Sequence, residues 1–212
     1  MRAESAADEA VMLKFEVATK RALEIIALDY GTDFQMGLSV PPGVDKPEPH
    51  ELEVVILRAP MMFGPGYQAL GSPIGIAAHV AAGRLPSFTD RVAYGGVPPQ
   101  ELWRAVGGLP TNYVKDNASC IQIALSAETL PHSIYNISSG FEGGARAQLE
   151  ALLAVAPDCA ERLGVTPEEM PELQAPVGFD SRRFEHDFGW KPGYTLESAM
   201  ADYLAWLERH PY

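Results

Sequence analysis

The apolar residues form two kinds of pattern along the chain, one typical of helices and one typical of buried strands. Between residues 6 and 31 the apolar positions recur every three or four residues and end at Gly31, which predicts one long amphipathic helix. The run from Leu52 to Leu57 is rich in β-branched residues and apolar on both faces, as is typical of a buried parallel strand. A sharp turn is expected after it, at Phe63–Gly66.

The rest of the chain alternates between short strands and helices and contains no internal repeat. Short strands are expected at Thr111–Val114 and Ser133–Ile137. The expected helices are Pro73–Ala82, Asp116–Ala127, Gly144–Ala154, Asp180–Phe188 and Thr195–Arg209.

Two of these helices carry more detailed expectations. Asp116 is expected to cap the N-terminus of its helix, because a carboxylate there can accept a backbone N–H. On the same helix, Ala118, Ile121, Ala124 and Leu125 are expected to line one side. The residues of the last helix that are expected to face inward are Leu196, Met200, Tyr203, Leu204 and Leu207.

The charge, the cysteines and the lack of long apolar runs argue against several kinds of partner and site. The net charge of −12 argues against a nucleic acid as partner, because phosphate backbones require a basic surface. It does not exclude a nucleotide, which a few local cations and helix N-termini can hold. Cys120 and Cys159 form no close pair, and the five histidines show no ligand spacing, so no metal site is predicted. With no signal peptide and no apolar span of about 20 residues, we expect a cytoplasmic protein that does not enter a membrane.

Several short motifs occur in a specific order, and together they carry a resemblance. The order is Lys20 with Glu24, Val55–Pro60 with Phe63–Gly66, Asn112–Asp116, Ile134–Ile137 with Gly140, and Asp180–Arg183 with Phe188–Pro192 and Trp206. This set resembles the C-terminal part of the extended short-chain dehydrogenase/reductases, the NAD-dependent epimerase/dehydratase family. The resemblance covers the chain from about residue 8 to Pro211.

The resemblance implies an α/β fold, the C-terminal portion of a Rossmann-type parallel sheet with a small mixed substrate lobe. Residues 1–66 would supply the last helix and strand of the dinucleotide-binding domain, and residues 67–212 the mixed substrate-binding lobe with interleaved sheet elements. Family members begin with a strand, a Gly-rich turn and a helix, but no G-x-G-x-x-G occurs here. We therefore expect the N-terminal Gly-rich βα units to be missing, in a fragment or a natural truncation.

The resemblance also points to a catalytic helix that departs from the family pattern. In the family a tyrosine and a lysine stand four residues apart, and the lysine lowers the tyrosine's pKa and holds the cofactor ribose. Lys20 fits the lysine, but Glu16 stands where the tyrosine is expected, unless Ala18 is an extra residue and Phe15 takes that place. Either way the phenol is lost. The alternative reading of Glu16 and Lys20 is an ordinary ion pair on one helix face.

Other site residues follow from the resemblance alone. The backbone of Pro60, Met61 and Met62 would face the nicotinamide of NAD or NADP, although the segment could also be a turn that only ends the strand. Three arginines stand where relatives hold the substrate, and each could instead be a solvated surface residue; they are Arg84, Arg182 and Arg183.

Two functions from different classes remain open. The first is an NAD(P)-dependent oxidoreductase, epimerase or dehydratase acting on a nucleotide sugar or a related carbonyl or alcohol. The second is a catalytically inactive remnant or interaction module that dimerises through the helix at 6–31, since the same helix contributes to a dimer interface in relatives.

Overall fold

The computed structural model describes residues 17–28, 53–66, 72–85, 110–170 and 179–210. The chain divides into two compact units, Met1–Ile56 with Leu130–Ile134 and Leu57–Thr129 with Tyr135–Tyr212. In the first unit, residues 17–28 form a helix within the predicted span 6–31. The remainder of that predicted helix lies outside the described residues.

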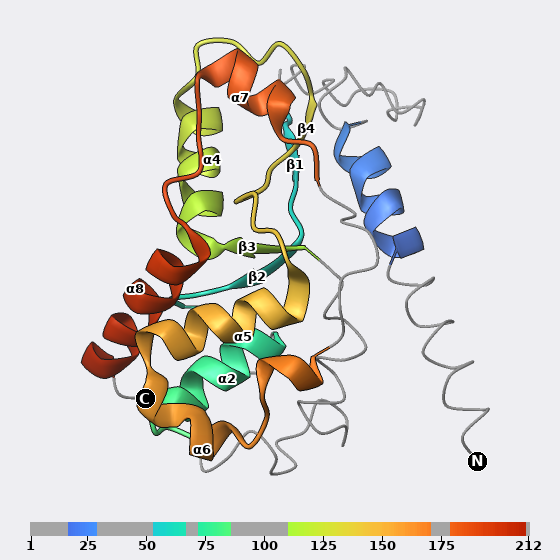
Figure 1. Ribbon diagram of the computed structural model, residues 1–212. Helices are drawn as coiled ribbons and strands as arrows, with labels where there is room; N and C mark the ends of the chain where they lie inside the picture. Colours follow the sequence, from blue (N-terminus) through green and yellow to red (C-terminus); the bar gives the residue numbers. More distant parts are fainter. Residues whose placement is uncertain (1–16, 29–52, 67–71, 86–109, 171–178, 211–212) are drawn as a thin grey trace, which may run out of the picture. The chain divides into compact units, whose positions relative to one another are not determined.

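The elements labelled in Figure 1 are, in chain order, β1 (Ile56–Arg58), β2 (Met61–Phe63), α2 (Pro73–Ala81), β3 (Thr111–Tyr113), α4 (Val114–Ser126), β4 (Ile134–Asn136), α5 (Gly144–Val155), α6 (Ala160–Leu163), α7 (Arg182–Phe188) and α8 (Leu196–Arg209). Single 3-10 turns lie at Pro157–Cys159 and Pro167–Glu169. The five predicted helices between residues 73 and 209 and the two later strands are confirmed to within two residues at their ends. The first strand begins at Ile56 instead of Leu52, and β2 was not predicted.

The described strands form two separate pairs. In the first pair, β1 bonds to β4: the Ile56 amide donates to the Ser133 carbonyl (2.8 Å), and the Ile137 amide donates to the Arg58 carbonyl (2.9 Å). Because these bonds advance in the same direction along both strands, the pair is parallel. In the second pair, β2 and β3 are parallel with Met62 opposite Asn112. Each pair therefore has a carboxyl edge, the edge at which ligands bind in open α/β folds.

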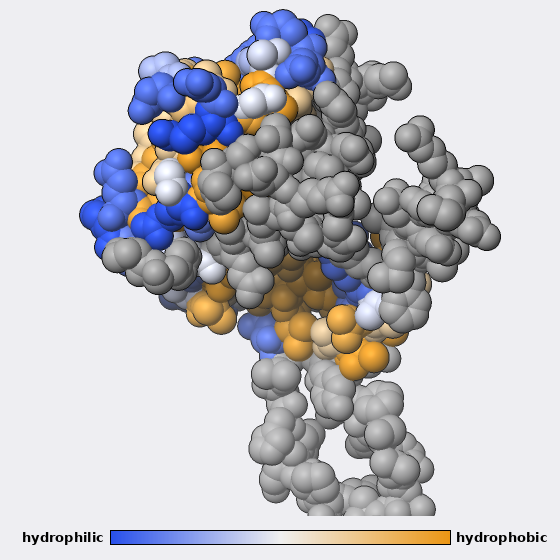
Figure 2. All heavy atoms as spheres, turned by 90° about the horizontal axis from the view of Figure 1, so that it is seen from below, coloured by the Kyte–Doolittle hydropathy of each residue, from blue (hydrophilic) through white to orange (hydrophobic). Residues whose placement is uncertain are grey.

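Helix α2 forms the centre of the second unit's core. All nine of its residues are buried, and it contacts α5, α6 and α8, which lie around it in Figure 1. Its start follows from the sequence: the Ser72 hydroxyl accepts the Gly75 amide at 3.1 Å, and Pro73 needs no N–H partner in the first turn. Seen from below, the molecule carries hydrophilic side chains over the region of α6 and α8, as expected for their outer faces (Figure 2).

Helix α4 differs from the predicted orientation. Cys120 and Ala124 are buried, whereas Ile121 is 50% exposed and Leu125 82% exposed, so these two do not line the core. The prediction is wrong because apolar residues occur on both sides of the helix, and periodicity alone then does not single out the buried side.

Asp116 does not cap α4, because the helix begins two residues earlier, with Tyr113 at the cap position. Its Oδ1 instead accepts the amide of Gly193 at 2.9 Å. One turn further, the Ser119 hydroxyl accepts the indole N–H of Trp190 at 2.9 Å. The buried first turn of α4 thus holds the connection between α7 and α8.

Helix α8 is confirmed as an amphipathic helix that closes the core. Thr195 caps it, with its hydroxyl accepting the Ser198 amide at 3.2 Å. Met200, Tyr203 and Leu207 are buried, as predicted. The remaining two predicted residues are partly buried against the same core, and they are Leu196 and Leu204.

Candidate functional site

Two chain segments leave the carboxyl edge of the β1–β4 pair. The first runs from Ala59 through Pro60 into β2, and the second is Ile137–Ser139. Pro60, Ser138 and Ser139 are buried. Ligands of open α/β folds bind in the crevice beyond this edge, where the backbone of such segments can approach them closely. The edge is therefore the candidate site.

A buried asparagine side chain connects these segments. Asn112, in the middle of β3, is 0% exposed. Its Oδ1 accepts the Ser139 amide at 2.7 Å, and its Nδ2 donates to the Ile137 carbonyl at 3.2 Å and to Oδ1 of Asn117 at 2.8 Å. The backbone donor at Ser139 and the backbone acceptor at Ile137 fix which side of the Asn112 amide is oxygen and which is nitrogen.

Side chains of the loop Ile137–Ser139 add further hydrogen bonds. The Ser139 hydroxyl accepts the amide of Tyr113 at 3.0 Å, so β3 and the loop exchange bonds in both directions. One residue earlier, the Ser138 hydroxyl accepts the Gly140 amide at 3.1 Å. Buried polar groups that are satisfied in this way hold a single backbone geometry, because each broken bond would leave a desolvated group without a partner.

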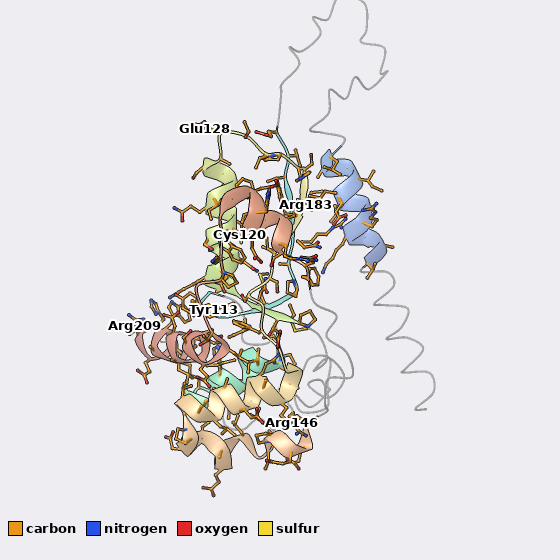
Figure 3. The ribbon with its side chains drawn as sticks, turned by 45° about the horizontal axis from the view of Figure 1, so that its top comes forward. Tyr113, Cys120, Glu128, Arg146, Arg183 and Arg209 are labelled. Carbon is orange, nitrogen blue, oxygen red and sulfur yellow. The ribbon has the colours of Figure 1, made fainter. Side chains whose placement is uncertain are left out.

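The carboxyl edge of the other pair, β2–β3, has a different chemistry. Its last residues are Phe63 and Tyr113, both fully buried, with ring centroids 5.4 Å apart. The next residue, Gly64, has a φ of +128°, and a Cβ there would lie 2.7 Å from the Tyr113 ring. Figure 3 shows Tyr113 between the strands and α8. Side chains therefore fill this edge.

One ion pair anchors the filled edge to α8. The Tyr113 hydroxyl donates to Oδ2 of Asp202, and the Lys115 ammonium lies 2.6 Å from the same oxygen. Burial acts to raise the pKa of Asp202, but the hydrogen bonds from Lys115 and Tyr113 outweigh it, and the pKa lies below the usual value. Burial and the neighbouring carboxylate raise the pKa of Tyr113 well above its usual value, so this phenol is a poor proton donor to a substrate.

The predicted catalytic residues belong to the first unit. Glu16 lies outside the described residues. Lys20 lies on the helix 17–28 with an exposed side chain. The neighbouring Arg21 pairs with Glu24, the glutamate of the predicted motif, at 3.0 Å. The pairing of Lys20 with Glu16 stays a prediction.

The predicted cofactor contacts lie in the second unit. Pro60 is buried just beyond β1, and Met61 and Met62 are half-buried at the start of β2. The segment is therefore not a simple turn: it enters a strand that pairs with β3, and the turn begins at Gly64. Their role toward a nicotinamide stays a prediction.

The predicted substrate arginines lie in two places. Arg84 follows α2 and is half-buried, with its amide bonded to the His79 carbonyl at 2.8 Å. Arg182 and Arg183 are exposed on α7, and α2 and α7 lie at opposite ends of the second unit in Figure 1; Arg183 is labelled in Figure 3. The Arg182 guanidinium bonds Asp180 at 2.9 and 2.6 Å, which holds the pKa of that carboxyl at about 2.

Sequence reasoning missed the importance of Asn112. The motif Asn112–Asp116 entered only as part of the resemblance, without a role for its first residue. A signal was present: a short polar residue stands in the middle of a strand whose three positions are all buried. A buried amide needs partners, so that position could have been marked as a hydrogen-bonding centre.

The two cysteines are not reactive, and the described residues hold no metal-binding group. Cys120 and Cys159 are buried and free, and burial raises the pKa of Cys120 to about 12. Such a thiol is not a nucleophile at neutral pH. Within the described ranges, no three His, Cys, Asp or Glu side chains form a metal-binding group. Among the helices of the same ranges, none has the length and apolar character needed to cross a membrane.

No protein-family model matches the sequence, and no curated protein matches it significantly. Solved structures do match the fold. RMD from Pseudomonas aeruginosa, complexed with NADPH, aligns with 91% of this chain and 56% of its own at 19% identity and a TM-score of 0.56. TunA, an NAD-dependent NDP-hexosamine 5,6-dehydratase involved in tunicamycin biosynthesis, aligns with 92% of this chain and 54% of its own at 18% identity and a TM-score of 0.54.

A third structure agrees with these two. A GalE-like L-threonine dehydrogenase from Cupriavidus necator, in its holo form, aligns with 74% of this chain and 48% of its own at 20% identity and a TM-score of 0.50. The chain spans about half the length of the solved structures it matches. It therefore shares the Rossmann-type α/β fold of these three structures over that part, which confirms the fold predicted from the resemblance.

Proposed function

We propose that the chain is part of an NAD(P)-dependent oxidoreductase, epimerase or dehydratase of the extended short-chain dehydrogenase/reductase family. Its substrate would be a nucleotide sugar or a related carbonyl or alcohol. The observation that carries the proposal is the carboxyl edge of β1–β4, formed by Pro60 and Ile137–Ser139, in a fold shared with a structure complexed with NADPH and with an NAD-dependent NDP-hexosamine dehydratase.

The proposal gives each part of the chain a role. The backbone at Pro60–Met62 would face the nicotinamide, and Lys20 would hold the adjoining ribose. Glu16, in the tyrosine's place, could accept a proton from a substrate hydroxyl but would be a poor acid at neutral pH, because a free glutamate titrates near about 4.3. A hydride moved to or from the nicotinamide would complete the reaction.

The cofactor's pyrophosphate and the substrate's phosphates need separate partners. The 212 residues contain no G-x-G-x-x-G, so the proposal requires the pyrophosphate to be held by residues outside them. A nucleotide sugar's diphosphate suits arginine, which binds it through two parallel hydrogen bonds. Arg84, Arg182 and Arg183 are the proposed contacts, and only some of them can serve one ligand if the α2 and α7 ends of the unit stay apart.

The experiment is a titration with NADH, NADPH and reduced nicotinamide mononucleotide, followed by the fluorescence of the reduced nicotinamide. The mononucleotide is the half of the cofactor whose proposed contacts all lie in this chain. We expect saturable binding of at least one of these probes, weakened at least tenfold by Lys20→Gln. The matched control is Arg21→Gln, which removes the neighbouring exposed cation that pairs with Glu24. Absence of binding, or an equal effect of both variants, would contradict the proposal.

A second function is favoured by a different observation. Four apolar side chains of the helix 17–28 are at least half exposed, and they are Val17, Leu23, Ile25 and Ile26. An inactive interaction module would bury such residues against a second copy of the helix at 6–31. Sedimentation equilibrium separates the two functions: a dimer that Ile26→Glu dissociates, in a chain that binds no nicotinamide probe, favours the module.

A further inference from the structure

We propose that Asn112 is a positioning residue that fixes both chain segments leaving the carboxyl edge of β1–β4, and that ligand binding at this edge depends on its side chain. The inference rests on the proposed function, since it takes this edge as the place where the nicotinamide half of a cofactor binds. Nothing in the family motif assigns Asn112 a contact with cofactor or substrate here, so its effect would be exerted through the backbone it holds.

The Asn112 side chain bonds to the backbone of the segment that follows β4. Its oxygen accepts the Ser139 amide at 2.7 Å, and its nitrogen donates to the Ile137 carbonyl at 3.2 Å. These two backbone groups lie two residues apart on the same short loop. One planar amide that bonds both sets the direction of the loop as well as its position.

The backbone of Asn112 lies beside the segment that follows β1. In the parallel register of β2 and β3, Asn112 lies opposite Met62, and Thr111 lies opposite Met61. The chain reaches these positions only three to four residues after β1 ends at Arg58. One residue therefore joins the proposed nicotinamide contacts to the loop after β4.

Both N–H groups of the Asn112 side-chain amide are hydrogen-bonded, so each substitution of Asn112 removes a known set of bonds. The second N–H of Nδ2 goes to Asn117 Oδ1 at 2.8 Å, in the first turn of α4. Asn112→Asp keeps the oxygen that accepts from Ser139 but loses both donors, and it brings a negative charge toward the Ile137 carbonyl. Asn112→Leu has a similar shape and loses all three hydrogen bonds.

A matched control bonds to the same strand but lies outside this network. Gln148 is buried on α5, and its Nε2 donates to the hydroxyl of Thr111 at 3.2 Å. Gln148→Leu removes a buried side-chain hydrogen bond next to Asn112 but none to the loop after β4. It reports what a loss of stability alone does to ligand binding.

The experiment compares the affinity for NADH, for NADPH and for reduced nicotinamide mononucleotide in the full chain and in these variants, below each variant's midpoint of unfolding. Exchange of the Ser139 amide hydrogen is followed by NMR in the same samples. We expect Asn112→Leu to weaken binding and to speed Ser139 exchange, each by at least tenfold. Gln148→Leu should lower the Tm without either effect. If Asn112→Leu does not fold, Asn112→Asp is decisive, with an expected loss of affinity of at least threefold.

The possible results test the positioning role of Asn112 and the proposed function separately. Folded Asn112 variants that bind a probe as the wild type does would overturn the positioning role and leave the proposed function standing. Gln148→Leu weakening binding as much as the Asn112 variants would also overturn it, because loss of stability would then explain the effect. A wild-type chain that binds none of the three probes would overturn the proposed function and the positioning role with it.

Discussion

The two strand pairs have the same arrangement but end in different chemistry. Both are parallel, and each has a carboxyl edge. At the β2–β3 edge the strands end in Phe63 and Tyr113, whose rings fill the space. At the β1–β4 edge the chain continues into Pro60 and into Ile137–Ser139, and the backbone of Ile137–Ser139 is held by hydrogen bonds to the Asn112 side chain. The residues that follow a strand, and not the strand pairing, decide which edge can receive a ligand.

Substitutions at the two edges are expected to affect different properties of the protein. Packing at the β2–β3 edge joins Phe63 to Tyr203 of α8, with ring centroids 6.4 Å apart. Substitutions there should change the free energy of unfolding. Substitutions that break the hydrogen bonds at the β1–β4 edge should change ligand affinity, because these bonds hold the backbone of Ile137–Ser139.

The largest effect on stability is expected for Phe63→Ala. The side chain is fully buried among the rings of Tyr113, Phe141 and Tyr203, and deletion of a buried phenylalanine costs about 3–5 kcal/mol. Urea unfolding followed by circular dichroism measures the loss. The control is Met62→Ala, one residue earlier and half-buried, which should cost less. Equal losses would show that the ring of Phe63 does not dominate the packing at the β2–β3 edge.

A smaller loss is expected for Tyr113→Phe, which removes only the hydroxyl that donates to Asp202. A hydrogen bond to a charged acceptor that is partly exposed contributes about 1–2 kcal/mol. The lowered pKa of Asp202 means that its carboxylate stabilises the fold above the unfolded value near about 3.9, and that this contribution disappears as the pH falls through the lower, folded value.

The pH dependence sharpens this second prediction. The difference in unfolding free energy between the wild type and Tyr113→Phe should be constant from pH 5 to 8 and should shrink as the pH falls below about 4. Urea titrations at several pH values provide the measurement. A difference that grows in acid would show that the hydroxyl does not depend on an ionised Asp202.

A third prediction concerns His79, which is buried on α2 with its ring 6.1 Å from that of Tyr203. Burial, with a smaller effect from Arg84, lowers the pKa of His79 below its usual value. The unfolded chain therefore binds a proton near about pH 6.5 that the folded chain does not, and stability should fall as the pH drops below that value. The Tm measured between pH 7.5 and 5.5 should decline in the wild type and decline less in His79→Gln.

The smallest effect is expected for Arg182→Gln. Its ion pair with Asp180 is exposed to solvent, so its loss should leave the Tm unchanged. Any change in affinity for a nucleoside diphosphate, measured by calorimetry, would then report a ligand contact and not a stability effect. Lys191→Gln is the matched control, because Lys191 is an exposed cation three residues beyond α7 and has no proposed ligand contact. A clear fall in Tm for Arg182→Gln would show that this surface helps to hold the fold.

The elements that sequence reasoning identified share strong local signals. Pro73 and Thr195 mark the starts of α2 and α8, and their spans follow from periodicity and capping. Strand β2 was missed because three residues are too short to show a period, and the strand is defined only by its pairing with β3. The buried side of α4 was misassigned at Ile121 and Leu125 because apolar residues surround that helix.

The candidate site was predictable only in part. Pro60–Met62 could be placed beyond a strand end, because that position follows from the strand prediction. Asn112 and Ser139 could not be connected, because they are 27 residues apart and meet only through the arrangement of β3 and β4. Contacts of this kind depend on tertiary structure and leave no local pattern.

The most direct test of the β1–β4 edge uses the methionines as probes. Met61 and Met62 lie at this edge, whereas Met170 and Met200 are buried among the helices. With 13C-labelled methionine methyl groups, assigned through Met61→Leu and Met62→Leu, reduced nicotinamide mononucleotide is titrated into the chain. We expect saturable shifts of the Met61 or Met62 methyl signals and none of Met170 and Met200. Unchanged Met61 and Met62 signals at saturating probe would contradict the assignment of this edge to a nicotinamide ligand.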